Sequence, residues 1–417
     1  MPVQSMIENL IQKLQYRHLV QQIGNFLYIV LIFAIVFDPT NSVFHLKNVI
    51  FILLVGFNCM FFKPDFSYLP HILLVYFVVV ICHVFSVMQG SVIDQELLMG
   101  TIKGFSPLFL LLWIPYYNVI KLSKKVIVAA SVMITILYLI VISSDAIQLA
   151  VFYFVKEHDS MIMMTRRNFL GLHIFGMYYK SIISFIFIVF FYYYEVYNSK
   201  EHRIGNIICC SFITFAFLIS GTRSTMLLPF FMIGLVMYRT LLTKKRVKYI
   251  LFPVLGVFVL GMLFLVFMLA TQEGEASNQI KYAHLISYQR LFDGHPAYMI
   301  FGQGPGAVFY SEGFRSWTSQ TEWTYFELLR NYGLFALGIL IILFIPLFKL
   351  IQYRTNEIAA GFLMAYVFYL AIAGTNPLLI SSTGMIVLLM AYSFVHIVER
   401  YPEDAALSGH EFLKKHF

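Results

Sequence analysis

The chain is poor in charged residues. Only 12% of its 417 residues are Asp, Glu, Lys or Arg, whereas 60% are hydrophobic. A soluble globular domain carries about 25% charged residues, so this deficit excludes a water-soluble enzyme and indicates an integral membrane protein. The net charge of +8 is therefore interpreted by its distribution across a membrane, and no nucleic-acid partner is expected.

Cysteine is also scarce, and no cleavable signal is visible. Cys59, Cys82, Cys209 and Cys210 all lie in apolar runs, which predicts buried thiols and excludes a disulfide framework or zinc spacing. Residues 1–22 are too polar for the apolar core of a signal peptide. They are expected instead to form an amphipathic segment on the cytoplasmic membrane surface.

Motifs for metals, cofactors and covalent catalysis are missing as well. No His/Asp/Glu cluster has metal-ligand spacing, and no Ser-His-Asp order or nucleophile elbow is present. The run Gly302-Gln303-Gly304-Pro305-Gly306 is not followed by Gly-Lys-Ser/Thr and does not open a βαβ unit. It is interpreted as a turn, and the sequence predicts no metal, no cofactor and no covalent nucleophile.

Long apolar runs, by contrast, dominate the chain. A membrane span needs about 20 mostly apolar residues. Twelve segments qualify, namely 23–38, 43–62, 68–88, 98–117, 125–143, 172–194, 205–221, 224–241, 249–270, 332–350, 357–374 and 380–397. The sequence therefore predicts an all-α polytopic protein, with transmembrane helices 1–9 in residues 23–270, helices 10–12 in residues 332–397 and a cytoplasmic tail at 398–417.

The basic residues assign the two sides of the membrane. With the N-terminus inside, most lysines fall in inner connections, and the short outer connections at 39–42 and 89–97 contain no Lys or Arg. Both termini are therefore expected in the cytoplasm. Residues 271–331 then form one large extracytoplasmic loop, the obvious place for chemistry outside the bilayer. ATP and nucleotide sugars are absent from that side, which favours a preformed, lipid-linked substrate.

Arginine is enriched on the predicted outer side. Arg223 lies between two apolar runs, where an arginine is costly unless it faces a cavity or a partner; capping a tight reversal is the alternative. Lys180, inside the predicted sixth span, could snorkel to the interface or line an anionic headgroup site. The other outer arginines could either bind a diphosphate or form ion pairs with acidic residues on the same side. They include Arg166, Arg167, Arg290 and Arg315.

The end of the large loop carries a candidate base. Residues 319–329 are expected to form a helix that leads into the tenth predicted span. Glu322 in its first turn favours the helix dipole, which is a structural reason for a carboxylate there. It would also be well placed as a base at the membrane surface. His284 and His295 could titrate near neutral pH, although a surface or turn histidine is the simpler interpretation.

Four short motifs, in this order, resemble the O-antigen polymerase and O-antigen ligase superfamily. They are Ser220-Gly221-Thr222-Arg223-Ser224 at a span junction, Arg290 ahead of Phe301–Gly306, Tyr325–Gly333, and Thr375–Leu379 with Ser381–Met385. The resemblance covers the chain from about residue 160 onward. It implies a GT-C-like architecture in the bacterial inner membrane and metal-independent glycosyl transfer at the periplasmic face. An undecaprenyl-diphosphate-linked oligosaccharide is the implied donor and acceptor, and a polysaccharide chain-length regulator is a candidate partner.

The resemblance also implies roles for individual residues. Ligases of this superfamily place a His-Asn pair where this chain has Glu322-Trp323, so the chain is more similar to the polymerases. Arg223 and Arg290 are then expected to stabilise the diphosphate leaving group, and Glu322 to accept the proton of the acceptor hydroxyl. The predicted substrate contacts are Arg166, Arg167, Lys180, Arg315 and Tyr325.

Three alternatives stay open. An O-antigen ligase would transfer the glycan to lipid A–core instead of to another repeat unit. A lipid-linked oligosaccharide flippase or other transporter would move the substrate without chemistry, although the single oversized loop and the lack of repeat symmetry disfavour it. A peptidoglycan-type glycosyltransferase is the third.

Overall fold

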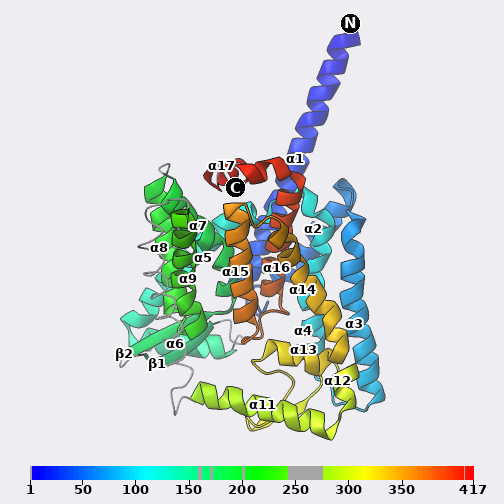
Figure 1. Ribbon diagram of the computed structural model, residues 1–417, viewed down its shortest axis with the longest axis vertical. Coiled ribbons are helices and arrows are strands. Elements are labelled where there is room, and N and C mark those ends of the chain that lie inside the picture. The colour runs from blue at the N-terminus through cyan, green and yellow to red at the C-terminus, as the bar shows by residue number, and fades with distance from the viewer. Residues whose placement is uncertain (1, 158–161, 170–171, 200–201, 243–275, 408) are drawn as a thin grey trace.

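The protein is a mostly helical bundle (Figure 1). The computed structural model describes residues 2–157, 162–169, 172–199, 202–242, 276–407 and 409–417. Within them, seven helical segments are long and apolar enough to cross a membrane: Gln15–Phe37, Phe66–Met88, Gln95–Tyr116, Val119–Ser143, Lys180–Asn198, Thr324–Gln352 and Ser382–Arg400. The prediction of a helical, multi-pass membrane protein is confirmed at this level. The predicted span 249–270 lies outside the described residues.

Four further predicted spans coincide with shorter apolar helices. These are Leu46–Phe61, Arg203–Ile219, Ser224–Met237 and Glu357–Ala373. The elements of the first half of the chain are α1 (Pro2–Phe37), α2 (Leu46–Phe61), η1 (Phe66–Tyr68), α3 (Leu69–Met88), α4 (Gln95–Phe105), η2 (Ser106–Tyr116), α5 (Val119–Ser143), α6 (Asp145–Glu157), β1 (Ile162–Phe169), β2 (Leu172–Tyr179), η3 (Lys180–Phe185), α7 (Ile186–Asn198), α8 (Arg203–Ile219) and α9 (Arg223–Leu242).

The second half holds the large loop and the last spans. Its elements are α11 (Ala276–Gly294), α12 (Ala297–Phe301), β3 (Phe309–Ser311), β4 (Ser316–Thr318), α13 (Thr324–Tyr332), η4 (Gly333–Phe335), α14 (Ala336–Gln352), α15 (Glu357–Ala373), α16 (Ser382–Arg400), η5 (Pro402–Ala406) and α17 (Gly409–His416). We call residues 276–332 the loop subdomain. It lies at one end of the bundle, and both chain termini lie at the other (Figure 1).

Three boundaries differ from the prediction. The helix expected over 319–329 begins only at Thr324, so Glu322 lies before α13 and not in its first turn, and the helix-dipole reason for a carboxylate there does not apply. Helix α1 is continuous from Pro2 to Phe37, so no helix end separates the expected N-terminal segment from the first span, and α1 projects beyond the bundle (Figure 1). The predicted sixth span, 172–194, starts with a strand instead. Strand β2 pairs antiparallel with β1, and the helical part begins only at Lys180. Residues 172–179 include three aromatic residues and one β-branched residue, which suit a strand as well as an apolar helix.

Helix α16 forms the centre of the bundle. In its most apolar stretch, 89% of the residues are buried inside the protein. Phe394 of α16 stacks on Phe362 of α15 with ring centroids 4.1 Å apart, and Phe362 stacks on Phe187 of α7 at 4.0 Å. This aromatic stack joins three helices. Stacked rings bury large apolar areas in a defined geometry, so the stack helps to fix how these helices pack.

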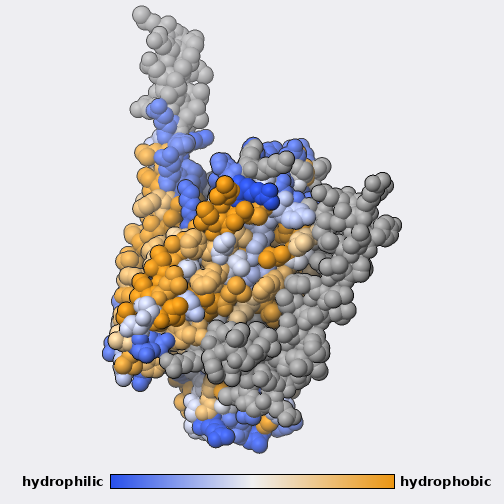
Figure 2. Space-filling view, turned by 90° about the vertical axis from the view of Figure 1, so that its left-hand side faces the viewer, coloured by the Kyte–Doolittle hydropathy of each residue, from blue (hydrophilic) through white to orange (hydrophobic). Residues whose placement is uncertain are grey.

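The outside of the bundle is apolar. Figure 2 shows a hydrophobic band across the middle of one face, with hydrophilic residues gathered toward its upper and lower ends. Helices α2 and α3 contribute exposed side chains such as Ile52 (68% exposed), Phe77 (58%) and Val80 (60%). An exposed apolar belt between polar ends is the surface expected where a helical bundle meets the bilayer core.

Candidate functional site

A buried ion pair organises the loop subdomain. Arg330 Nη2 lies 2.6 Å from Glu327 Oε2 on the same helix, and the Arg330 side chain is fully buried. The guanidinium also donates to the carbonyl oxygens of Ala307 (2.7 Å) and Ser319 (2.7 Å) and to Gln303 Oε1 (2.8 Å). A buried arginine is tolerated only when its donors are paired. Arg330 is therefore engaged in holding the loop together.

The second oxygen of Glu327 is occupied as well. Oε1 accepts hydrogen bonds from the Tyr288 hydroxyl (2.6 Å) and from the backbone N–H (3.1 Å) and hydroxyl (3.0 Å) of Thr321. Burial and the adjacent Glu327 carboxylate raise the pKa of Tyr288, which keeps the phenol protonated as a donor. Because both its oxygens are engaged, Glu327 is not free to accept a proton from a substrate.

The Gly302–Gly306 run joins the loop subdomain to the bundle. Gly302 (φ +76°) and Gly304 (φ +104°) adopt backbone angles that favour glycine, and a Cβ there would overlap the carbonyl of Asn331 and the side chain of Ser86, respectively. The N–H of Gly304 donates to the Asn331 carbonyl at 3.1 Å. The run thus packs backbone against backbone at the end of α13 and against α3. It is a structural joint, consistent with its interpretation as a turn.

Glu322 lies where the loop subdomain meets the connection between α15 and α16 (residues 374–381, called the α15–α16 connection below). Glu322 Oε2 is 3.5 Å from Lys281 Nζ, and the two side chains are 38% and 27% exposed, respectively. Lys281 Nζ also lies 3.4 Å from the carbonyl oxygen of Thr375. The Glu322 carboxylate therefore lies beside a cation and is still accessible to solvent. A proton acceptor for a bound hydroxyl has to be accessible in this way.

Three hydrogen bonds fix the backbone next to Glu322. The Thr324 N–H donates to the Gly374 carbonyl (3.0 Å), and the Thr324 hydroxyl donates to the Asn376 carbonyl (2.5 Å). The Tyr325 hydroxyl donates to the Leu370 carbonyl at 2.9 Å. The start of α13 is thus bonded to the end of α15, so the position of Glu322 is set by the bundle and not by the loop alone.

His284 lies buried beneath the same surface. Its Nδ1 is 2.9 Å from Ser311 Oγ, and its Nε2 has no hydrogen-bond partner among the described residues. Burial lowers the pKa of His284, and the charge of Glu322 opposes that effect only in part. The imidazole is therefore neutral at pH 7 and enclosed, whereas Glu322 faces outward.

The far end of the α15–α16 connection meets a second cation. Lys47, the second residue of α2, donates from Nζ to the Pro39 carbonyl (2.9 Å) and lies 3.2 Å from the hydroxyl of Ser382. Asp38 and Lys103 both interact electrostatically with Lys47. Asp38 is itself buried and accepts hydrogen bonds from backbone N–H groups of the α1–α2 turn. The connection therefore has Lys281 with Glu322 at one end and a pair of lysines at the other.

The structure does not bring Arg290 to Glu322. Arg290 is 68% exposed and forms an ion pair with Glu312. It is nine residues beyond Lys281 on α11, which is about 13 Å along a helix axis. Arg315 is exposed at the tip of the β3–β4 hairpin, with a left-handed φ of +51°. The proposed roles of both arginines stay predictions.

Other predicted site residues are placed by their backbone. Arg223 is the first residue of α9, and the hydroxyl of Thr222, just before it, shares a hydrogen bond with the hydroxyl of Thr225 within α9. Arg166 and Arg167 lie in β1. The side chains of these three arginines lie outside the described part of the structure. Lys180 is half-buried as the first residue of η3.

The sequence did not reveal which residues surround Glu322. Lys281 lies on another helix, and Thr375 and Asn376 lie beyond the next two spans, so their contacts depend on tertiary structure. The Glu327–Arg330 pair carried a local signal, because opposite charges three residues apart face one another on a helix.

In the described ranges, His, Cys, Asp and Glu side chains form no group of three or more that could hold a metal ion. No protein-family model, no curated protein and no solved structure matches the chain.

Proposed function

We propose that this chain is a polysaccharide polymerase of the bacterial inner membrane. It joins undecaprenyl-diphosphate-linked oligosaccharide repeat units into O-antigen, or a related surface polysaccharide, at the periplasmic face without a metal. The observation that carries the proposal is Glu322, a solvent-open carboxylate paired loosely with Lys281 at the edge of an apolar bundle. A lipid-linked glycan needs a polar site for its sugars directly beside an apolar path for its polyprenyl tail, and this junction offers both.

The proposed architecture has about twelve spans in a GT-C-like arrangement, with both termini in the cytoplasm. Seven long and four shorter apolar helices among the described residues support this number, together with the predicted span 249–270. The positive-inside pattern supports the orientation. The loop subdomain lies opposite the termini (Figure 1), as a periplasmic catalytic face requires.

The reaction forms one bond and breaks one. A hydroxyl of the acceptor repeat unit attacks the anomeric carbon of the donor glycan, and Glu322 takes the hydroxyl proton as the new glycosidic bond forms. The bond from the anomeric carbon to the diphosphate oxygen breaks, its electron pair stays on undecaprenyl diphosphate, and the configuration inverts. The leaving group gains negative charge, which fixed cations stabilise. Arg223 and Arg290 are the proposed cations, and for Arg290 this role requires that it leave its ion pair with Glu312 when the donor binds.

The substrate contacts follow from the same proposal. Arg166, Arg167, Lys180, Arg315 and Tyr325 would bind the diphosphates and sugars of donor and acceptor. The Tyr325 hydroxyl already donates a hydrogen bond to the Leu370 carbonyl. Its proposed role is therefore to contact the substrate with its ring, or to position Glu322. A long polymer must enter and leave laterally, and a chain-length regulator is the proposed protein partner.

Replacing Glu322 by Gln tests the proposal. The variant keeps the size of the side chain and removes its basicity, so we expect polymer to disappear while the amount of protein in the membrane stays at the wild-type level. Glu96→Gln is the matched control, because Glu96 is an exposed carboxylate at the start of α4, on the same predicted side. Full-length polymer from Glu322→Gln would remove Glu322 as the base.

The glycan banding pattern of a deletion strain separates the alternatives. Lipopolysaccharide capped by a single repeat unit supports a polymerase. Long chains stranded on undecaprenyl diphosphate would instead identify a ligase, and loss of all periplasmic repeat units would identify a flippase. Purified protein that elongates lipid-linked repeat units in detergent excludes the transporter outright.

A further inference from the structure

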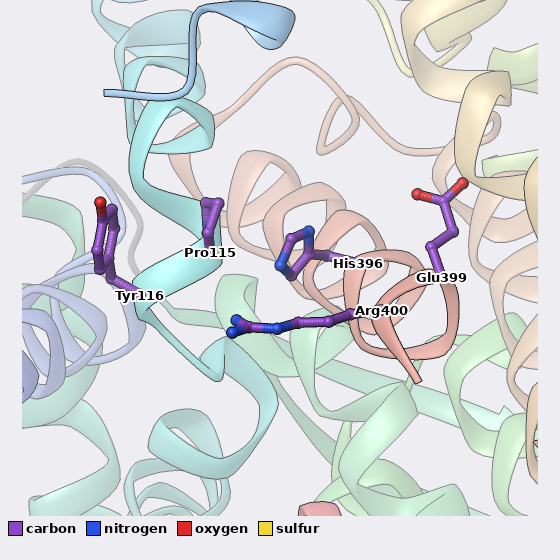
Figure 3. A pocket seen from close by; sticks show the side chains of 5 residues that line it. All are labelled: Pro115, Tyr116, His396, Glu399 and Arg400. Atoms are coloured by element: carbon purple, nitrogen blue, oxygen red, sulfur yellow. The ribbon is translucent and has the colours of Figure 1, made fainter. Parts of the chain in front are cut away.

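A pocket of about 670 Å³ lies at the end of the bundle opposite the loop subdomain. It is lined by Pro115, Tyr116, His396, Glu399 and Arg400 (Figure 3). The first two residues end η2, and the other three belong to the last turns of α16. Two candidate membrane spans therefore end at this pocket, which places it at the level where a bilayer changes from hydrocarbon to headgroups.

Two hydrogen-bond donors point into the pocket. In Figure 3, His396 and Arg400 extend toward Pro115 and Tyr116, and Glu399 points away from them. Lys349 Nζ lies 2.9 Å from the Glu399 carboxylate and balances its charge. Within the described residues, no carboxylate pairs with Arg400, and His396 Nε2 is buried without a hydrogen-bond partner. Arg400 is exposed and lies over the Tyr401 ring, with its Cζ 5.6 Å from the ring centroid. Within the described part of the chain, the pocket thus holds an arginine charge without a carboxylate partner and an imidazole nitrogen without a hydrogen bond.

The opposite wall is aromatic and continues into apolar surface. The Tyr116 ring packs against the Phe62 ring with centroids 4.7 Å apart. The Tyr116 carbonyl accepts a hydrogen bond from Gln21 Nε2 of α1 at 2.7 Å. Phe62 in turn contacts Phe57 (centroids 6.1 Å apart), and Phe57 contacts Phe61 of α2 (4.8 Å), which is 43% exposed. An apolar chain that leaves the pocket along α2 would therefore stay in contact with aromatic side chains.

We propose that this pocket binds the phosphate headgroup of an anionic membrane lipid. Arg400 and His396 Nε2 donate to the phosphate oxygens, Tyr116 packs against the glycerol, and the acyl chains lie along α2. Arginine suits a phosphate because its planar fork can donate two hydrogen bonds to two oxygens. A basic pocket between helices at the membrane surface is a known form of lipid site. A free phosphate ion would use the same donors but not the apolar wall.

Lipid binding to purified protein tests the proposal. The full-length protein in detergent is mixed with dioleoylphosphatidylglycerol or with zwitterionic dioleoylphosphatidylcholine, and bound lipids are counted by native mass spectrometry. We expect the anionic lipid to be retained, and Arg400→Gln to weaken it roughly ten-fold, the loss expected for a hydrogen bond to a charged group. Arg354→Gln is the matched control, because it removes an exposed positive charge from the nearby α14–α15 turn and not from the pocket.

Two further measurements decide between the remaining outcomes. His396→Gln should also weaken the anionic lipid, and it gives an independent result if Arg400→Gln does not fold. If inorganic phosphate binds the wild-type protein as tightly as the anionic lipid does, the apolar wall contributes nothing and the lipid proposal is wrong. Equal lipid retention by Arg400→Gln, His396→Gln and Arg354→Gln would also overturn it, and would leave Arg400 only the role of offsetting the dipole of α16.

Discussion

Replacing Glu327 by Gln should loosen the loop subdomain far more than the same replacement at Glu322. Glu327 accepts hydrogen bonds from Tyr288, Thr321 and Arg330, and a glutamine amide in place of Oε2 would face the N–H groups of Arg330. Breaking a buried ion pair from one side costs about 3–5 kcal/mol, because the remaining charge stays buried. The Glu322–Lys281 pair is at 3.5 Å and partly exposed. Its loss should therefore cost about 0–1 kcal/mol after solvent screening.

Amide hydrogen exchange of α13 measures this difference directly. If the subdomain opens locally, a loss of about 3–5 kcal/mol should accelerate exchange more than roughly 100-fold in Glu327→Gln. Glu322→Gln should change exchange less than roughly ten-fold. Equal exchange in the two single variants would refute the assignment of Glu327 to structure and Glu322 to chemistry.

Three further predictions concern the joint, the pH response and the arginine at the span junction. Gly304→Ala should lower the apparent melting temperature in detergent because its Cβ would overlap Ser86, whereas Gly100→Ala, with open space around it, should not. Hydrogen bonds from the N–H of Leu97 and the hydroxyl of Ser319 hold the pKa of the Asp94 carboxyl below its ordinary 3.8. The Asp94 carboxylate therefore stabilises the folded protein fully above pH 3.8, and this stabilisation is lost as the pH falls through the lower pKa of the folded state. Asp94→Asn should then reduce the drop in melting temperature between neutral and acidic pH; an unchanged drop would contradict this. Arg223→Ala should abolish polymer at a normal membrane level, and wild-type chain lengths from this variant would exclude Arg223 from the site.

The helices were predictable because the signal for a span is local. A run of about 20 apolar residues has few alternatives in a chain this poor in charge. The error at 172–179 has a physical reason. Those residues are apolar enough for a span, but their aromatic and β-branched side chains also suit a hairpin, and the pairing with β1 decides between the two. Sequence alone does not contain that pairing.

The surroundings of the candidate base could not be predicted from the sequence. Glu322 was predicted to lie in the first turn of a helix that enters the membrane, but it lies just before α13, next to Lys281 and the α15–α16 connection. These contacts link positions far apart in the chain, so periodicity cannot reveal them. The role of Glu322 as a base stays a prediction. The pairing of Arg290 with Glu312 and the burial of Arg330 likewise depend on how the loop folds back on itself. An arginine in a sequence does not show which carboxylate it will meet.

The central position of α16 has a consequence for biosynthesis. This helix is among the last parts of the chain to leave the ribosome, yet its neighbours α7 and α15 pack their aromatic rings against it. Helices that are inserted earlier therefore lack their central packing partner until α16 enters the membrane. A nascent chain that stops before residue 382 lacks α16, and membrane quality-control proteases should degrade it.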